Sequence, residues 1–166
     1  MKLSKQLSFI VLVFSINYFL DRITKIIAIK YLQGKYYTFL GELIVLTYVE
    51  NEGAFLGAGS NLPTFVKVIV FIILPLLICI GGIIYCLLKE NDKYAIAYIV
   101  SIAAGGIANI QDRIFNDGKV TDFLNFGIGN LRTGILNVAD MSITFGAILL
   151  VIHEIRKELK HSKDNK

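Results

Sequence analysis

Four long apolar runs constrain the fold of this chain more than any other feature of its sequence. Each is close to the roughly 20 residues that an α-helix needs to cross the hydrocarbon core of a bilayer. The chain has 166 residues, 55% of them hydrophobic, and a mean hydropathy of +0.63, so lipid is its main solvent. Because a segment in lipid must satisfy its own backbone hydrogen bonds, we expect four transmembrane helices. They would span about residues 7–29, 65–88, 94–110 and 137–155.

The first apolar run follows Lys2 and Lys5, as the apolar part of a secretory signal would. No cleavage site of small residues comes after it, and the charged residues Asp21 and Arg22 interrupt it instead. We therefore interpret the run as a transmembrane helix that is retained in the mature protein.

Basic residues are concentrated in three short segments, 1–6, 89–93 and 156–166, which four spans would place on one side of the membrane. Short segments rich in Lys and Arg usually face the cytoplasm, so we expect both termini there, with 156–166 as a basic tail. The net charge of the chain is +4, and much of its positive charge lies in these segments beside the spans. It therefore indicates membrane orientation rather than nucleic-acid binding.

Two segments between the spans have the composition of strands. Residues 36–50 are rich in β-branched and aromatic side chains and are interrupted by Gly41, which predicts two short strands. Residues 122–130 alternate loosely between apolar and polar and predict another strand. The sequence thus predicts a mainly α, integral membrane protein. It would form a single domain over residues 1–166, with four transmembrane helices and a small extracytoplasmic β-rich cradle.

Polar side chains recur at helical spacing in three of the four runs, each time toward the end that this topology places outside. Three polar faces at one depth predict a polar pocket inside the bundle, open to the outer interface. The alternative, in which polar residues at helix ends meet lipid headgroups, suits Arg22 and Lys30 better than it suits these stripes. The stripes consist of Asn17, Asp21 and Lys25, of Asn109, Asp112, Arg113 and Asn116, and of Asn137, Asp140 and Thr144.

Two of the acids have a basic residue close by in the sequence. Lys25 follows Asp21 by four residues, in the favourable order of acid before base on a helix. Arg113 stands directly beside Asp112. We expect both acids to form structural ion pairs that support the pocket.

Asp122 and Asp140 have no such neighbour. A carboxylate at the edge of a membrane core costs several kcal/mol unless it is paired or protonated. A hairpin between these two residues could bring them together, and two close carboxylates share one proton, as in aspartic proteases. We therefore predict that one of them takes a proton from water while its protonated partner polarises a scissile carbonyl.

Other kinds of active site fit the composition poorly. His153 and His161 lie among lysines without metal-ligand spacing, so we expect neither a histidine-ligated zinc site nor a Ser-His-Asp triad. Cys79 and Cys86 fall on one face of one apolar run and are interpreted as packing residues. The small residues around 105–106 lack a phosphate-loop lysine and indicate close helix packing.

Five motifs of this sequence resemble, in the same order, those of the bacterial lipoprotein signal peptidase family, or signal peptidase II. Together they cover nearly the whole chain, and five in order are far more specific than any one of them. Ala108 and Leu136 stand where the family usually has Gly and Phe, and Glu52 adds a carboxylate inside the second motif. The motifs are an Asp-to-Lys pattern at 21–25, Asn-x-Gly-Ala-Phe at 51–55, a Gly-Gly…Asn…Asp-Arg pattern at 105–113, and two catalytic-aspartate motifs at 120–123 and 137–140.

The resemblance implies a multi-pass aspartic endopeptidase of the bacterial cell (inner) membrane. Its substrates would be diacylglyceryl-modified prolipoproteins, from which it would remove the signal peptide by cutting before the lipid-bearing Cys. The active site would lie near the outer leaflet, in contact with membrane lipids, and would need no metal or organic cofactor. Asp122 and Asp140 would be catalytic. Substrate would be bound or oriented by Asn51, Gly53, Asn109, Arg113 and Asn137, and structural support would come from Asp21, Lys25 and Asp112.

Two alternatives stay open at this point. A non-enzymatic four-helix membrane protein whose carboxylates relay protons would carry acids along the inner halves of its spans, and here those halves have none apart from Glu154 at the last turn of the fourth run. A catalytically impaired member of the family would keep the fold and lose rate, because Ala108 and Leu136 depart from the usual motifs.

Overall fold

A computed structural model describes residues 3–54 and 57–164 of the chain. This part contains four helical segments long and apolar enough to cross a membrane, which confirms the predicted mainly α fold with four candidate membrane helices. The helices are α1 (Leu3–Tyr31), α2 (Thr64–Val68), η2 (Ile69–Ile73), α3 (Leu74–Leu88), α4 (Lys93–Phe115) and α5 (Val138–Asp164). The strands are β1 (Tyr36–Phe39), β2 (Ile44–Asn51), β3 (Val120–Ile128) and β4 (Leu131–Leu136).

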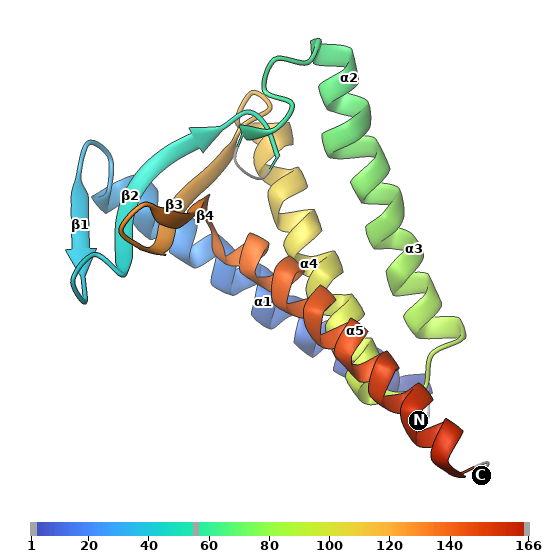
Figure 1. Ribbon diagram of the computed structural model, residues 1–166. Coiled ribbons are helices and arrows are strands. Elements are labelled where there is room, and N and C mark those ends of the chain that lie inside the picture. The colour runs from blue at the N-terminus through green and yellow to red at the C-terminus, as the bar shows by residue number, and fades with distance from the viewer. Residues whose placement is uncertain (1–2, 55–56, 165–166) are drawn as a thin grey trace.

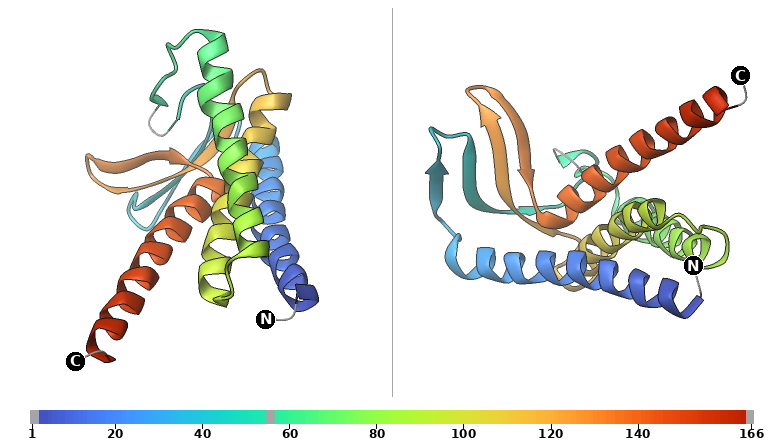
Figure 2. Two further views of the ribbon diagram at one scale, coloured as in Figure 1. Left: turned by 90° about the vertical axis from the view of Figure 1, so that its right-hand side faces the viewer. Right: turned by 90° about the horizontal axis from the view of Figure 1, so that it is seen from below.

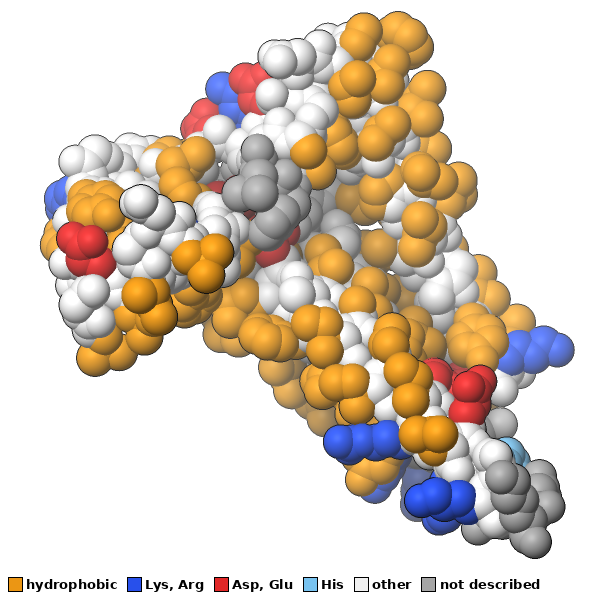
Figure 3. All heavy atoms as spheres, viewed as in Figure 1, with side chains coloured by type: hydrophobic (Ala, Val, Ile, Leu, Met, Phe, Trp, Pro, Cys, Tyr) orange, Lys and Arg blue, Asp and Glu red, His pale blue; other side chains and the backbone are white. Residues whose placement is uncertain are grey.

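The ends of the four spans alternate as the sequence requires. The start of α1 and the end of α5 lie at the same end of the bundle, and the sheet lies at the opposite end (Figure 1). Hydrophobic side chains cover most of the visible surface of the helices, and Lys and Arg gather near the end of α5 (Figure 3). Large apolar side chains such as Leu77 and Phe19 are more than half exposed, as expected of residues that face lipid.

α4 is the central helix and packs against α1, α3 and α5. Its small residues let the neighbouring helices approach closely. A Cβ atom added to Gly105 would lie 2.5 Å from the carbonyl oxygen of Ala139 in α5. One added to Gly106 would lie 2.6 Å from Sγ of Cys79 in α3. Helix packing therefore explains both glycines.

The second span is interrupted between α2 and α3. The interruption is a π-helical turn, Ile69–Ile73, and Pro75 follows it in the first turn of α3. Proline has no N–H for the carbonyl four residues earlier, and its ring would collide with that carbonyl in a regular α-helix. The wider π turn before the proline accommodates both effects, and such turns are frequent next to functional sites.

The sheet has the strand order β1-β2-β3-β4, and every neighbouring pair is antiparallel. The strands predicted within 36–50 and 122–130 are therefore confirmed. The sequence does not predict β4, because Gly134, at a φ of +78°, interrupts its short alternating pattern. The β2–β3 register places Val49 opposite Asp122 and Asn51 opposite Val120.

The sheet is fixed to the end of α1. Ala28 and Leu32 of that helix form a buried cluster with Phe123 of β3. Figure 2 shows the strands beside this end of α1, with β4 leading into α5. Because Asp122 precedes Phe123, this packing turns β3 so that its acid lies at the junction of sheet and bundle.

Candidate active site

Asp122 is held between two asparagine side chains. Its Oδ2 accepts a hydrogen bond from Nδ2 of Asn51 at 2.9 Å, and its Oδ1 accepts one from Nδ2 of Asn137 at 2.6 Å. Asn51 reaches it because β2 ends beside β3, and Oδ1 of Asn51 accepts the N–H of Gly53 at 3.0 Å. The residue is 2% exposed, so both oxygens are oriented by protein groups.

Asp140 lies in the first turn of α5 and forms a reciprocal cap with Asn137. Oδ1 of Asn137 accepts the N–H of Asp140 at 2.8 Å, and Oδ2 of Asp140 accepts the N–H of Asn137 at 3.2 Å. This is the exchange of a capping box, which begins the helix and fixes the carboxylate. Oδ1 of Asp140 also accepts Nδ2 of Asn109 at 2.8 Å. Asn137 therefore caps α5 and contacts Asp122 with the same side chain.

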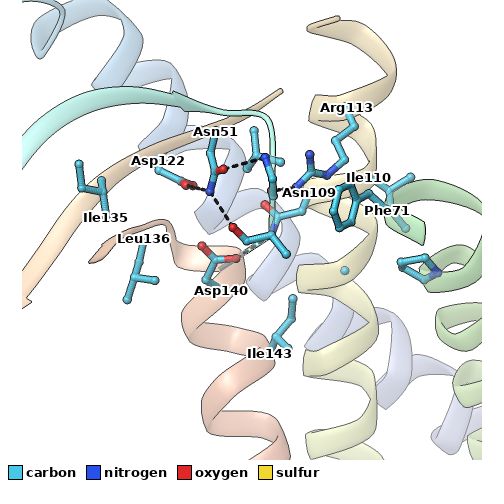
Figure 4. Close-up of a pocket in the computed structure, with 15 residues that line it drawn as sticks. Asn51, Phe71, Asn109, Ile110, Arg113, Asp122, Ile135, Leu136, Asp140 and Ile143 are labelled. Atoms are coloured by element: carbon cyan, nitrogen blue, oxygen red, sulfur yellow. Dashed lines mark hydrogen bonds between the residues drawn. The ribbon is translucent and has the colours of Figure 1, made fainter. Parts of the chain in front are cut away.

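The two carboxylates line one cavity of about 220 Å³ (Figure 4). Among the described residues, each accepts hydrogen bonds from neutral N–H groups, and neither forms an ion pair. Burial, together with the negative charge of Asp140, raises the pKa of Asp122 to about 6, although the two asparagine donors oppose the shift. A site with these properties retains a proton close to neutral pH.

The other two acids are neutralised by cations. Nζ of Lys25 lies 3.0 Å from Asp21 and 2.8 Å from Asp112, and Arg22 lies 2.8 Å from Asp21 and 2.6 Å from Asp112. The predicted pair of Asp21 with Lys25 is therefore confirmed. The predicted pair of Asp112 with Arg113 is wrong. Asp112 faces Arg22 and Lys25 of α1, whereas Arg113 donates to backbone carbonyl oxygens on the other side of α4.

This charged cluster also fixes the backbone before each acid of the cavity. Oδ1 of Asp21 accepts the N–H of Ala139 at 2.9 Å, one residue before Asp140. Oδ2 of Asp112 accepts the N–H of Thr121 at 3.2 Å, one residue before Asp122. Through these bonds, Asp21 of α1 fixes the backbone beside Asp140, and Asp112 of α4 fixes the backbone beside Asp122.

Lys25 uses its third hydrogen for a contact with the cavity. Its Nζ donates to Oδ1 of Asn109 at 2.9 Å, and Oδ1 of Asn109 also accepts Nδ2 of Asn137 at 3.2 Å. The amide of Asn109 is thereby oriented with its Nδ2 toward Asp140. All three ammonium hydrogens have an acceptor, so this buried lysine has no donor left for substrate.

Arg22 also belongs to this charged cluster, so the interpretation that it meets lipid headgroups is wrong. It bridges Asp21 and Asp112 with an 18% exposed side chain. The available signal was its position beside Asp21 on a helix face that must meet α4. Of the polar stripes, Asn116 and Thr144 are exposed and do not join the pocket.

Arg113 and Gly53 hold the loop that carries Asn51. Arg113 donates to the carbonyl oxygens of Gly53 at 2.6 Å and of Gly118 at 2.8 Å, and its guanidinium lies 4.9 Å from the ring centre of Phe71. A Cβ atom on Gly53 would come within 2.5 Å of the Gly57 backbone, so only glycine fits. Phe71, which the π turn presents to the cavity, is a lining residue that no sequence motif indicated. Phe55, the last residue of the 51–55 motif, lies outside the described residues.

Comparison with known proteins identifies the family. The model of the family described as Signal peptidase (SPase) II matches residues 12–156. A lipoprotein signal peptidase of Borrelia duttonii (strain Ly) is 34% identical over 147 residues, covering 85% of this chain and 86% of the relative. The protein of the same name from Borreliella afzelii (strain PKo) is 33% identical, covering 82% and 83%.

A solved structure described as a bacterial membrane enzyme superposes with a TM-score of 0.75 at 27% identity. The match covers 90% of this chain and 88% of that one. Sequence and fold agree over almost the entire length, and the chain belongs to the signal peptidase II family of membrane peptidases.

Proposed function

We propose that this chain is an aspartic endopeptidase that removes the signal peptide from diacylglyceryl-modified prolipoproteins by cutting before the lipid-bearing Cys. The names of its relatives supply the substrate class. The observation that carries the chemistry is the pair Asp122 and Asp140. They line one cavity, both contact Asn137, and neither forms an ion pair with a described residue.

In this mechanism the two acids share one proton. The ionised carboxylate takes a proton from water, whose oxygen attacks the scissile carbonyl carbon, while the protonated carboxyl donates its proton to the carbonyl oxygen. When the C–N bond breaks, the leaving nitrogen takes the proton removed from water, and the other proton returns to its carboxylate. The apparent pKa values belong to the pair rather than to either residue.

The remaining motif residues position the two carboxylates and the loop above the cavity, and they do not take part in bond making or breaking. Asn51, Asn109 and Asn137 orient the carboxylates by donating to them, and Arg113 with Gly53 holds the loop above the cavity. Asp21 and Asp112 fix the backbone before the two acids, and Lys25 joins these carboxylates to Asn109. These roles agree with the assignment of Asp21, Lys25 and Asp112 to structural support.

We place the termini in the cytoplasm and the cavity near the outer leaflet, within one membrane-embedded domain. The basic segments 1–6, 89–93 and 156–166 support this orientation. A lipid on the substrate Cys would hold the scissile bond at the membrane surface, among membrane lipids. Cysteine labelling at Ser60 and Asn91 tests the orientation: labelling of Ser60 from the cytoplasmic side would overturn it.

The experiment that tests the function is cleavage of a model prolipoprotein by the purified protein in detergent. We expect the diacylated substrate to yield a product whose first residue is the lipid-bearing Cys, identified by mass spectrometry. The same sequence without lipid should be cut far more slowly. Absence of cleavage, with the protein folded, would favour the non-enzymatic or impaired alternatives.

A further inference from the structure

β4 is an edge strand whose far end meets the candidate active site. It pairs with β3 on one side, and within residues 3–54 and 57–164 no strand pairs with its other side. The strand runs directly into Asn137 and the first turn of α5. Its free edge therefore ends beside Asp140.

The cavity of the two acids touches this edge. Ile135 and Leu136 both line it (Figure 4). Successive side chains of a strand point to opposite faces of a sheet, so a cavity bounded by both residues meets the strand along its edge. In Figure 4 these two residues lie on one side of the acids, and Phe71 and Arg113 lie on the other.

A second open space adjoins the end of β4 and the acids. A second cavity of about 460 Å³ is lined by Ile135 together with Asn51 and Asp122. It extends outward past Val49 and Glu50 of β2. The two cavities share Asn51, Asp122 and Ile135 and thus form one path that passes Asp122 and the end of β4.

The end of β4 beside the cavity, Ile135 and Leu136, carries nothing that blocks a further pairing; the irregular register with β3 lies farther along, between Asn125 and Gly127. Natural edges are usually blocked by proline, by a charged side chain or by a covering loop. β4 contains no proline, and its single charged residue, Arg132, reaches back to the carbonyl oxygen of Glu42 at 2.9 Å. That contact directs the guanidinium toward the β1–β2 turn and away from the path.

We propose that the substrate segment around the scissile bond binds as an added, extended strand along the free edge of β4. The inference rests on the proposed function and extends it to the mode of binding. Main-chain hydrogen bonds would provide affinity for any sequence, and the cavities would select side chains at alternate positions. An extended segment also exposes the scissile carbonyl, which a helical signal peptide would keep in its own hydrogen bonds.

An N-methyl scan of a synthetic diacylated lipopeptide tests this mode. Each peptide carries one methylated backbone nitrogen among the residues flanking the scissile bond. Because a paired strand alternates inward and outward N–H groups, methylation should lower kcat/KM by on the order of tenfold at every second position only. The unmethylated lipopeptide and those methylated at intervening positions are the matched controls.

The outcomes separate this inference from the proposed function. If the unmethylated lipopeptide is not cut before its Cys, the proposed function fails. If it is cut, but methylation acts equally everywhere or nowhere, the function stands and the added strand is wrong.

A crosslinking experiment gives a second measurement. Ile135→Cys should form a disulfide with a lipopeptide that carries a free thiol beside the scissile bond. Ile128→Cys, at the other end of the β3–β4 hairpin and 77% exposed, should not. Crosslinking at Ile128→Cys alone would place the peptide elsewhere and overturn the proposal. The native Cys79 and Cys86 are buried and serve as an internal background.

Discussion

Two pairs of aspartates lie at the junction of sheet and bundle, and the two pairs have partners of different charge. Asp21 and Asp112 share two cations, Lys25 and Arg22. Asp122 and Asp140 receive hydrogen bonds from amide groups. All four acids are buried or partly buried within one contact network, so burial alone does not distinguish them.

The difference is one of charge. An acid that bridges two cations is a structural element, because loss of its charge leaves the cations without a partner. An acid bound by neutral donors keeps its orientation and remains free to exchange a proton. Under the proposed function, one pair of aspartates is structural and the other is chemical, and the two pairs are joined through Asn109 and Lys25.

The largest expected effect is on turnover. Asp122→Asn and Asp140→Asn should each lower kcat by a factor of about 10³ or more, since the remaining acid cannot act alone as both proton donor and acceptor. Cleavage of the diacylated substrate measures the loss, and the helical circular dichroism should be unchanged. Near-normal turnover by either variant would remove that residue from the catalytic pair.

The opposite pair should respond in stability. Asp112→Asn leaves Arg22 and Lys25 in excess over their acids and should lower the free energy of unfolding by roughly 3–5 kcal/mol. Thermal unfolding in detergent measures this change. Glu52→Gln, at an exposed ion pair with Lys67, is the control and should cost less than about 1 kcal/mol. A fully stable but inactive Asp112→Asn protein would show that Asp112 takes part in the chemistry.

The corresponding substitution Asp122→Asn should instead raise the free energy of unfolding. Asp122 has a folded-state pKa of about 6, above the value of roughly 3.9 for an unfolded chain, so its ionisation opposes folding. Stability should therefore rise as the pH falls from about 6 to about 4 and be lost as the pH rises again. Asp122→Asn removes the charge and should stabilise the protein at pH 7 by on the order of 1–3 kcal/mol. Unfolding curves of both proteins at pH 4 and pH 7 should converge at the lower value.

The smallest expected effects concern pH and metal dependence of the wild-type rate. A pair that works with one shared proton gives a bell-shaped profile, which falls when both acids are protonated and when both are ionised. EDTA should leave the rate unchanged, since no three His, Cys, Asp or Glu side chains of the described residues cluster as metal ligands. Inhibition by EDTA that added zinc reverses would contradict the two-acid mechanism.

The apolar runs predict the helices because lipid imposes a length and a composition on each span. The partners of the acids are harder to predict, because they depend on which helix faces meet. Asp21 and Lys25 pair within α1, so their spacing reveals the contact. Asp112 pairs across to α1, and neither its neighbour Arg113 nor any periodicity could indicate Arg22. Likewise, β4 forms because β3 offers an edge, and its own sequence contains only a weak strand signal.

The double use of Asn137 has a consequence for the timing of activity. Its side-chain amide caps α5 and also donates a hydrogen bond to Asp122. Formation of the first turn of α5 therefore also brings Asp122 and Asp140 into position. Under the proposed mechanism, fraying of the first turn of α5 would separate the acids and stop hydrolysis, so the rate should report the population of this helical turn. A chain that is still entering the bilayer, and whose fourth span has not yet formed, should therefore have no peptidase activity.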